Sequence, residues 1–228
     1  YLIKEKISQI DGLRVLCLSL DGSDKIHDYI RRKKGAYKSV LEAARLARKK
    51  KMPVYFRTVL SRLNLSQIDF ILNLASRLEI GVLFQPATQN LYGTAGINSI
   101  APFPKEYRKA IDKLIIEKRN GNKYIHTPIP VLKYIRRWPR PSKISCISER
   151  IFFHLRPDAI LYPCIWNRDL KALKGRDCLR MGVKEAIRTL PKTSPCDGCW
   201  DVAVCNFNFS FFEAGINTEK AVENNSIF

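Results

Sequence analysis

Five cysteines in the second half of the 228-residue chain have the spacing of metal ligands. Two residues separate Cys196 from Cys199, so both thiolates can lie on one tight turn, and Cys205 follows after five more residues. Cys146 and Cys164 bracket a segment that predicts two short strands around a turn, which would return the second thiolate to the first. Thiolates supplied in such pairs bind an iron–sulfur cluster or a structural zinc ion. The spacing therefore predicts a metal-bearing protein.

The other two cysteines are not expected to bind metal. Cys17 lies in an apolar run and is expected to be a small buried hydrophobe, and Cys178 has no close cysteine partner and is expected to be structural. The odd total of seven, the CxxC spacing and the lack of a secretory signal favour metal ligands in a cytoplasmic protein over disulfides. No run of about 18 apolar residues occurs, so no transmembrane helix is expected.

The chain is strongly basic, with 40 Lys and Arg against 21 Asp and Glu and a net charge of +19. Such a charge suits a polyanionic partner such as nucleic acid, an anionic membrane surface or an acidic substrate. The basic residues are dispersed over several predicted helices with little aromatic interleaving, so a solvated surface explains the charge as well. A zinc-bearing basic module that binds nucleic acid without catalysis is the alternative function.

The first half of the chain alternates predicted strands with predicted helices. Apolar runs of strand length occur at residues 14–20, 53–60 and 81–85. Helical apolar spacing spans residues 38–51, and Ser66 is the expected cap of a second helix that ends near Leu78. Apolar strands that alternate with helices indicate an α/β fold with a parallel sheet and right-handed crossovers.

Functional residues of parallel sheets follow the carboxyl ends of the strands. The polar candidates at these positions are Ser19, Asp21, Arg57, Thr58 and Gln85. Further helices are expected at residues 105–118, 126–138 and 183–190. Pro139-Arg-Pro141 predicts a linker between the strand-and-helix half and the cysteine-bearing half.

Two motifs together resemble a known enzyme family. Ser19-Leu-Asp-Gly, then His27-Asp-x-x-Arg31, then Gly35 and Tyr37, resembles the fourth strand and following loop of radical S-adenosylmethionine (SAM) enzymes. The cysteine pattern resembles the SPASM extension of that family, or its shorter twitch form, which holds auxiliary 4Fe–4S clusters. The resemblance covers essentially the whole chain.

Two departures from the SPASM pattern matter for the expected metal content. Ala159 replaces the turn glycine between Cys146 and Cys164, which would strain the backbone if that position has a positive φ. Phe209 stands where the fuller extension has a further cysteine. The resemblance therefore implies one auxiliary 4Fe–4S cluster held by four of the five candidate cysteines, with Cys205 ranked last.

The resemblance implies an incomplete, partial TIM-type radical SAM barrel over residues 1–140 and a SPASM/twitch-like extension that binds the auxiliary cluster over residues 141–228. It implies that Ser19 meets the SAM ribose and Arg31 the SAM carboxylate. Arg57, Asn64 and Gln85 are the further cofactor-binding candidates. The alternative for Arg31 is an ion pair with Asp24 or Asp28, and His27 is expected to organise its loop rather than to act as a catalyst.

The implied enzyme releases a 5′-deoxyadenosyl radical from SAM and abstracts hydrogen from a peptide or a small molecule. Ferredoxin or flavodoxin is the implied reductant. The CxxxCxxC motif that binds the SAM-cleaving cluster is absent from the 228 residues, and so are the first three strands of the barrel. The chain is therefore expected to be either a fragment of a larger radical SAM enzyme or the product of a gene truncation, and not to cleave SAM by itself.

Overall fold

The computed structural model describes residues 15–89, 98–140, 153–163, 175–190 and 199–213. The chain divides into two compact units. Unit 1 consists of Tyr1–Gln89 and Asn98–Arg140, and unit 2 consists of Asn90–Ile97 and Pro141–Phe228. The division after Arg140 falls at the proline-rich linker, while the assignment of the two units to a barrel and a cluster-binding extension stays a prediction.

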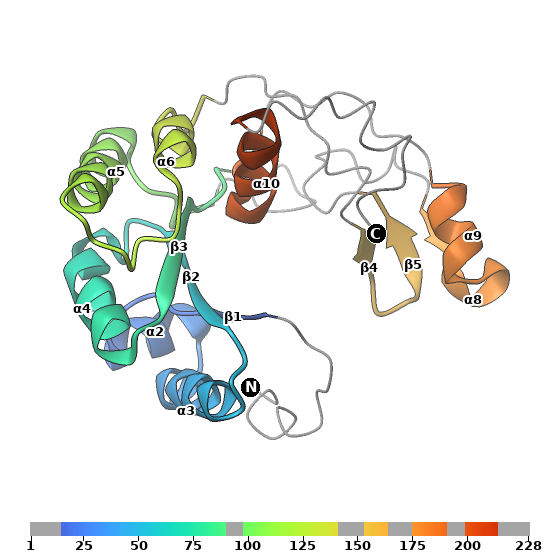
Figure 1. Cartoon of the computed structure of the whole chain (residues 1–228), viewed down its shortest axis with the longest axis horizontal. Coiled ribbons are helices and arrows are strands. Elements are labelled where there is room, and N and C mark those ends of the chain that lie inside the picture. The colour runs from blue at the N-terminus through green and yellow to red at the C-terminus, as the bar shows by residue number, and fades with distance from the viewer. Residues whose placement is uncertain (1–14, 90–97, 141–152, 164–174, 191–198, 214–228) are drawn as a thin grey trace. The chain divides into compact units, whose positions relative to one another are not determined.

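A parallel sheet of three strands forms the centre of unit 1. Its strands are β1 (Leu16–Ser19), β2 (Val54–Leu60) and β3 (Gly81–Pro86), in that spatial order. The helices α3 (Ala36–Lys49) and α4 (Ile68–Leu78) form the crossovers between consecutive strands (Figure 1). The predicted α/β class with a parallel sheet is therefore confirmed.

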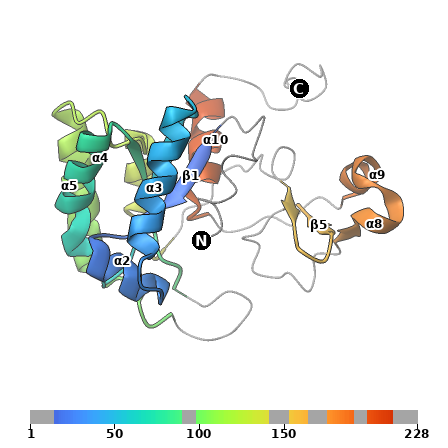
Figure 2. The same cartoon turned by 90° about the horizontal axis from the view of Figure 1, so that it is seen from below.

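Helices cover one face of this sheet. Leu18, Phe56 and Phe84 point to that face from the three strands and are at most 4% exposed. The helix α3 contacts β1 and β2, and α4 contacts β3. Figures 1 and 2 both show α3, α4 and α5 (Pro104–Arg119) on the same side of the strands. Burial of these alternating apolar side chains is the main stabilising term of unit 1.

The chain after α5 departs from the predicted helix at 126–138. Residues 125–127 run beside β3 instead: Val82 bridges to Ile125, and the Phe84 backbone N–H donates to the Thr127 hydroxyl at 2.9 Å. The helix α6 therefore spans only Ile129–Ile135. Backbone hydrogen bonds to an open strand edge outweigh the local helical spacing here.

The expected cap at Ser66 is also wrong. Ser66 lies inside the short 3₁₀ helix η1 (Leu65–Gln67), and α4 begins at Ile68 after Gln67 without a side-chain cap. The remaining helix of unit 1 is α2 (Asp24–Arg31), which follows β1. No helix in the described part of the chain is long and apolar enough to cross a membrane.

Gly81 leaves room for a histidine ring. A Cβ atom at this position would overlap Cδ2 of His126. We expect Gly81→Ala to lower the free energy of unfolding by about 1–3 kcal/mol, as overpacking does. In the His126→Ala background the same change should cost much less, and urea denaturation of the four proteins measures both values. Equal costs in the two backgrounds would show that the ring does not set the requirement for glycine.

The described part of unit 2 contains an antiparallel sheet and three helices. The strands are β4 (His154–Leu155), β5 (Ile160–Tyr162) and β6 (Arg176–Asp177), and β4 and β5 form the predicted hairpin. The helices are α8 (Cys178–Met181), α9 (Val183–Arg188) and α10 (Val202–Glu213). Cys178 packs in a small buried cluster with Leu161, Ala186 and Leu190, which confirms its structural role.

The hairpin turn places Ala159 in the left-handed region, with a φ of 61°. This conformation costs an L-residue about 1–2 kcal/mol, and glycine avoids most of that cost at the expense of about 0.5–1 kcal/mol of chain entropy. Ala159→Gly should therefore raise the stability of unit 2 by about 0.5–1 kcal/mol. Ala186→Gly, in the helix α9, is the matched control and should lower the stability. A lower urea midpoint for Ala159→Gly would contradict the prediction.

Candidate functional site

The face of the parallel sheet that the helices do not cover is open. Burial alternates along β1, so that Cys17 and Ser19 are exposed while Leu16 and Leu18 are buried. The expectation that Cys17 is buried is therefore wrong. An unbroken apolar run hides the two-residue period of a strand, and the sequence gives no sign of which face is covered.

Three of the predicted cofactor-binding residues lie on this open face, near the carboxyl ends of the strands. Ser19 is paired in register with Arg57, and the Arg57 Nε donates to Gln85 Oε1 at 3.0 Å. Gln85 is buried at 5% exposure, while Arg57 is half-buried and Ser19 is exposed. The face thus presents a hydroxyl and a guanidinium that the amide of Gln85 holds in place.

Arg31 forms an ion pair with a buried carboxylate in the loop after β1. Its Nε lies 2.6 Å from Oδ2 of Asp21, whose side chain is 2% exposed. The predicted alternative for Arg31 named Asp24 or Asp28, and the observed partner is Asp21 instead. Asp21 lies in the loop after β1, and Arg31 is the last residue of α2. The spacing of the two residues in the sequence does not reveal this contact.

His27 organises this loop, as expected. Its Nδ1 accepts a hydrogen bond from the Asp21 backbone N–H at 3.1 Å and lies 3.4 Å from the Asp21 carboxylate. The ring is buried, at 1% exposure. An accepting Nδ1 places the ring proton on Nε2 in the neutral tautomer.

Asn64 holds the loop after β2. Its Oδ1 accepts from the backbone N–H of Ser61 at 2.8 Å, and its Nδ2 donates to the Val59 carbonyl at 3.0 Å. The side chain is fully buried. These bonds give Asn64 a loop-ordering role, and its predicted contact with a cofactor stays a prediction.

A tyrosine and a histidine cover the other end of the open face. The rings of Tyr55 and His126 meet edge-to-face, with centroids 4.6 Å apart. Burial and the nearby charge of Lys118 lower the pKa of His126, and burial lowers the pKa of Lys118, whose Nζ donates to the Ile125 carbonyl. His126 is therefore neutral at pH 7. Sequence reasoning missed this residue because its place over Gly81 depends on the pairing of residues 125–127 with β3.

Unit 2 brings two of the five candidate ligand cysteines together. Cys205 Sγ donates to the Cys199 carbonyl at 3.3 Å, and the Asp201 backbone N–H donates to Cys199 Sγ at 3.4 Å. A hydrogen bond with Cys205, burial and the charge of Cys205 all raise the pKa of the Cys199 thiol. Cys205, which the sequence ranked last, is thus the immediate neighbour of Cys199.

The other three candidate ligands, Cys146, Cys164 and Cys196, lie outside the described residues. Within the described ranges, no three His, Cys, Asp or Glu side chains are grouped as a metal site requires. The metal site that the cysteine spacing predicts therefore stays a prediction.

Asp201 fixes Cys205 on the first turn of α10. Its Oδ1 accepts from the backbone N–H groups of Ala203 and Val204, and its backbone carbonyl accepts from the Cys205 N–H at 2.9 Å. Asp201 is 5% exposed. The sequence analysis did not assign this role, although an aspartate directly before an apolar helix is a recognisable capping signal.

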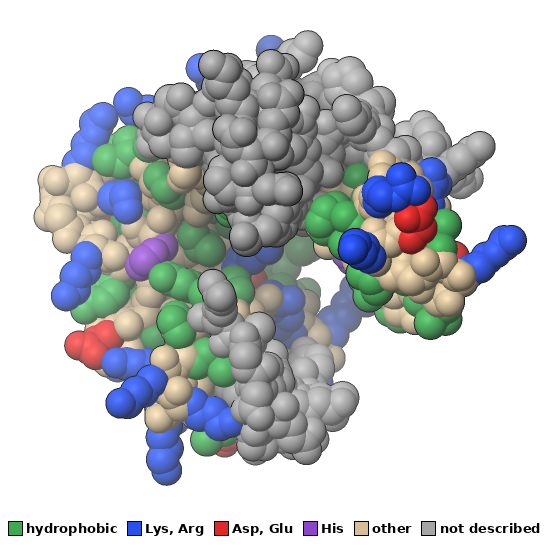
Figure 3. Space-filling view, turned by 45° about the vertical axis from the view of Figure 1, so that its right-hand side comes forward, with side chains coloured by type: hydrophobic (Ala, Val, Ile, Leu, Met, Phe, Trp, Pro, Cys, Tyr) green, Lys and Arg blue, Asp and Glu red, His purple; other side chains and the backbone are tan. Residues whose placement is uncertain are grey.

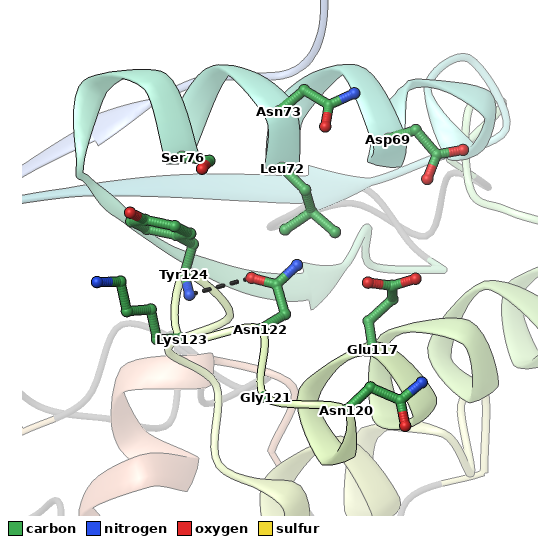
Figure 4. Close-up of a pocket in the computed structure, with 10 residues that line it drawn as sticks. All are labelled: Asp69, Leu72, Asn73, Ser76, Glu117, Asn120, Gly121, Asn122, Lys123 and Tyr124. Atoms are coloured by element: carbon green, nitrogen blue, oxygen red, sulfur yellow. Dashed lines mark hydrogen bonds between the residues drawn. The ribbon is translucent and has the colours of Figure 1, made fainter.

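A cavity of about 500 Å³ opens between α4 and the end of α5 (Figure 4). Its polar side chains include Asp69, Asn73 and Glu117, and Asp69 is already paired with Lys113 at 2.5 Å. Figure 4 shows Asn122 accepting a hydrogen bond from the Tyr124 backbone on the opposite wall. None of the residues predicted to bind a cofactor or a metal lines this cavity.

The surface carries the positive charge that the composition predicts. Figure 3 shows Lys and Arg side chains at many points of one face and Asp and Glu side chains at few. The described acidic groups are largely engaged: Asp112 pairs with Arg136, and Glu79 pairs with Arg48. These arginine hydrogen bonds lower the pKa of both carboxyl groups.

No protein-family model matches the sequence. Among solved structures, the chain is similar to native anSMEcpe, an anaerobic sulfatase-maturating radical SAM enzyme, with bound AdoMet. The TM-score is 0.57 at 17% identity, over 98% of this chain and 71% of that one.

Two complexes of the same enzyme with AdoMet and a peptide are also similar. With the Kp18Cys peptide the TM-score is 0.56 at 16% identity, over 97% of this chain and 72% of that one. With the Cp18Cys peptide the TM-score is 0.54 at 20% identity, over 82% of this chain and 53% of that one. The chain therefore shares the fold of these structures.

Proposed function

We propose that this chain is part of a radical SAM enzyme that acts on a peptide or a small molecule. One observation supports the proposal most directly: the open sheet face carries Ser19, Arg57 and Gln85 in a chain whose fold matches AdoMet-bound structures. Parallel sheets are ordinarily covered on both faces. A half-exposed face is therefore a place for a ligand.

Ser19 on this face and Arg31 at the end of α2 suit SAM by their chemistry. The exposed Ser19 hydroxyl can hydrogen-bond a ribose, and the Arg31 guanidinium, oriented by Asp21, can accept a carboxylate as partner. When bound, SAM supplies the 5′-deoxyadenosyl group for hydrogen abstraction. The chain's own residues would hold and orient SAM, and Asn64 and His27 would keep the two adjoining loops in shape.

An auxiliary 4Fe–4S cluster in unit 2 is part of the proposal. The adjacent Cys199 and Cys205 supply soft ligands on a helix start that Asp201 caps. A bound metal cation favours the thiolate form of its cysteine ligands, which opposes the raised pKa of Cys199. The cluster would relay an electron or anchor the substrate, and ferredoxin or flavodoxin would be the reductant.

Anaerobic reconstitution of the 228-residue chain tests the proposal. We expect about four irons per chain and an iron–sulfur charge-transfer band, as for one 4Fe–4S cluster. Stoichiometric zinc without iron after iron-replete anaerobic expression would overturn it. The same chain with dithionite should produce no 5′-deoxyadenosine, because it contains no CxxxCxxC motif.

The alternative is a zinc-bearing basic module that binds nucleic acid, favoured only by the net charge of +19. It predicts colourless protein whose affinity for polynucleotides falls steeply with salt. The colour of the purified protein and a salt series of binding isotherms separate the two functions.

A further inference from the structure

A second cavity of about 530 Å³ lies at the carboxyl end of the parallel sheet. Each of its walls comes from the segment that follows a different strand. Residues 28–34 follow β1, Leu63 follows β2 and Ile100 comes after β3. In α/β folds this end of the sheet carries the substrate and cofactor sites.

The floor of the cavity is apolar and its rim is cationic. Ile30, Leu63 and Ile100 are half-buried, whereas Tyr29 is exposed. The rim consists of three consecutive exposed cations, Arg32, Lys33 and Lys34. A ligand that matches both parts carries an apolar side chain between negative charges.

The four consecutive basic residues at 31–34 have two different roles. Arg31 turns inward to the buried Asp21, at 2.6 Å. The backbone of Arg32 takes the left-handed conformation that ends α2, with a φ of 49°, and the chain turns away from the helix there. Arg32, Lys33 and Lys34 are exposed and line the rim of the cavity, whereas Arg31 does not.

The cationic loop is held in one conformation. The Asp28 carboxylate accepts hydrogen bonds from the backbone N–H groups of Gly35 and Tyr37 at 2.5 and 2.8 Å. Burial opposes ionisation of Asp28, but these two bonds prevail and lower its pKa. Asp28 is the single acid among the described residues that line the cavity, and its carboxylate accepts the two bonds that close the loop. The described part of the wall therefore carries an excess of positive charge.

The opposite wall is also anchored. The Arg62 backbone N–H donates to the Ile100 carbonyl at 3.1 Å, which ties the segment after β3 to the loop after β2. Asn98 Nδ2 donates to the Thr88 carbonyl at 2.8 Å and holds the same segment from its other side. A binding surface that is formed before the ligand arrives loses less entropy on binding.

From these features we infer that the cavity binds an acidic peptide segment, and that the substrate of the proposed radical enzyme is such a peptide. The role of the peptide as a substrate rests on the proposed function. The binding of the peptide to the cavity does not. Carboxylates flanking a Leu or Phe side chain match the cationic rim and the apolar floor. Nucleic acid fits less well, because Tyr29 is the one aromatic ring among the described residues that line the cavity, and the described floor is aliphatic.

Fluorescence anisotropy with the full 228-residue chain tests the inference. The probe is a labelled short peptide in which two glutamates stand on each side of a Leu-Phe pair. The matched probes replace the glutamates with glutamine, or the Leu-Phe pair with two serines. We expect the first probe to bind most tightly and its affinity to fall with added salt.

Two triple variants give the matched comparison. The combination Arg32→Glu, Lys33→Glu and Lys34→Glu should lower the affinity for the acidic probe by about tenfold or more. The combination Lys49→Glu, Lys50→Glu and Lys51→Glu makes the same change in net charge at the end of α3 and should leave binding within about twofold of the unchanged chain. Leu63→Ser should weaken binding through the floor alone, without any change of charge.

Three outcomes would overturn the inference. The acidic probe could fail to bind, both triple variants could weaken it equally, or a single-stranded RNA of matched length could displace it at lower concentration. Iron content and absorption of the same protein samples report on the proposed function separately. A chain with its cluster but without peptide binding would refute only the inference, and peptide binding by a chain without iron would refute only the proposed function.

Discussion

Cys199→Ala should abolish cluster binding in unit 2 and lower the melting temperature of that unit. Cys199 is 7% exposed and lies against Cys205, so its removal takes away one ligand and leaves a small cavity beside the other thiol. Small metal-binding units derive much of their folding free energy from the metal. Iron content and absorption after anaerobic reconstitution, followed by a thermal melt, measure both effects.

Cys17→Ala is the control for this experiment. Cys17 lies on the open face of the parallel sheet in unit 1 and is exposed, so the exchange should keep the iron content and the melting temperature. Equal iron content in Cys199→Ala and the unchanged protein would place the cluster elsewhere. Cys205→Ala should resemble Cys199→Ala if the two thiols serve one site.

Arg31→Met should lower the free energy of unfolding of unit 1 by about 2–3 kcal/mol. The change leaves the Asp21 carboxylate, 2% exposed, without its guanidinium partner at 2.6 Å. Loss of one partner of a fully buried ion pair costs about 3–5 kcal/mol. We expect only about 2–3 kcal/mol because Arg31 is one-third exposed and water partly screens its charge. Urea denaturation at pH 7 measures the change.

A double-mutant cycle isolates the pair. In the Asp21→Asn background the same Arg31→Met exchange should cost less by about 1–2 kcal/mol, because no buried charge is left behind. Arg31→Lys keeps the positive charge but loses the planar guanidinium. It should therefore lower the free energy of unfolding, but by less than Arg31→Met does. Additive costs in the cycle would mean that Arg31 stabilises α2 by packing alone.

The polar end of the open sheet face and the cavity of about 530 Å³ share one structural cause. In a parallel sheet all carboxyl ends point the same way, so the loops after β1, β2 and β3 meet at one edge. Asp21, Asn64 and Asn98 each fix one of these loops by hydrogen bonds. Sites at this edge therefore need few residues from each loop, and those residues are far apart in the sequence.

The amino-acid sequence by itself determined the α/β class and the alternation of strands and helices in unit 1. Buried strands have apolar runs that end at polar or turn-forming residues, and this signal is local. The hairpin around Ala159 was predictable for the same reason, since its turn residues stand between two short apolar segments. The motif from Ser19 to Tyr37 also led to the family whose fold the solved structures share.

Only the tertiary structure decided which face of the strands is open and which partners the charged groups have. The exposure of Cys17 depends on helices that cover the opposite face, and the pairing of Arg31 with Asp21 depends on how α2 folds back over the end of β1. Residues 125–127 run beside β3, with one bridge between Val82 and Ile125, because β3 offered unpaired backbone groups. Each of these outcomes is a long-range contact, and its free energy is not encoded in the spacing of neighbouring residues.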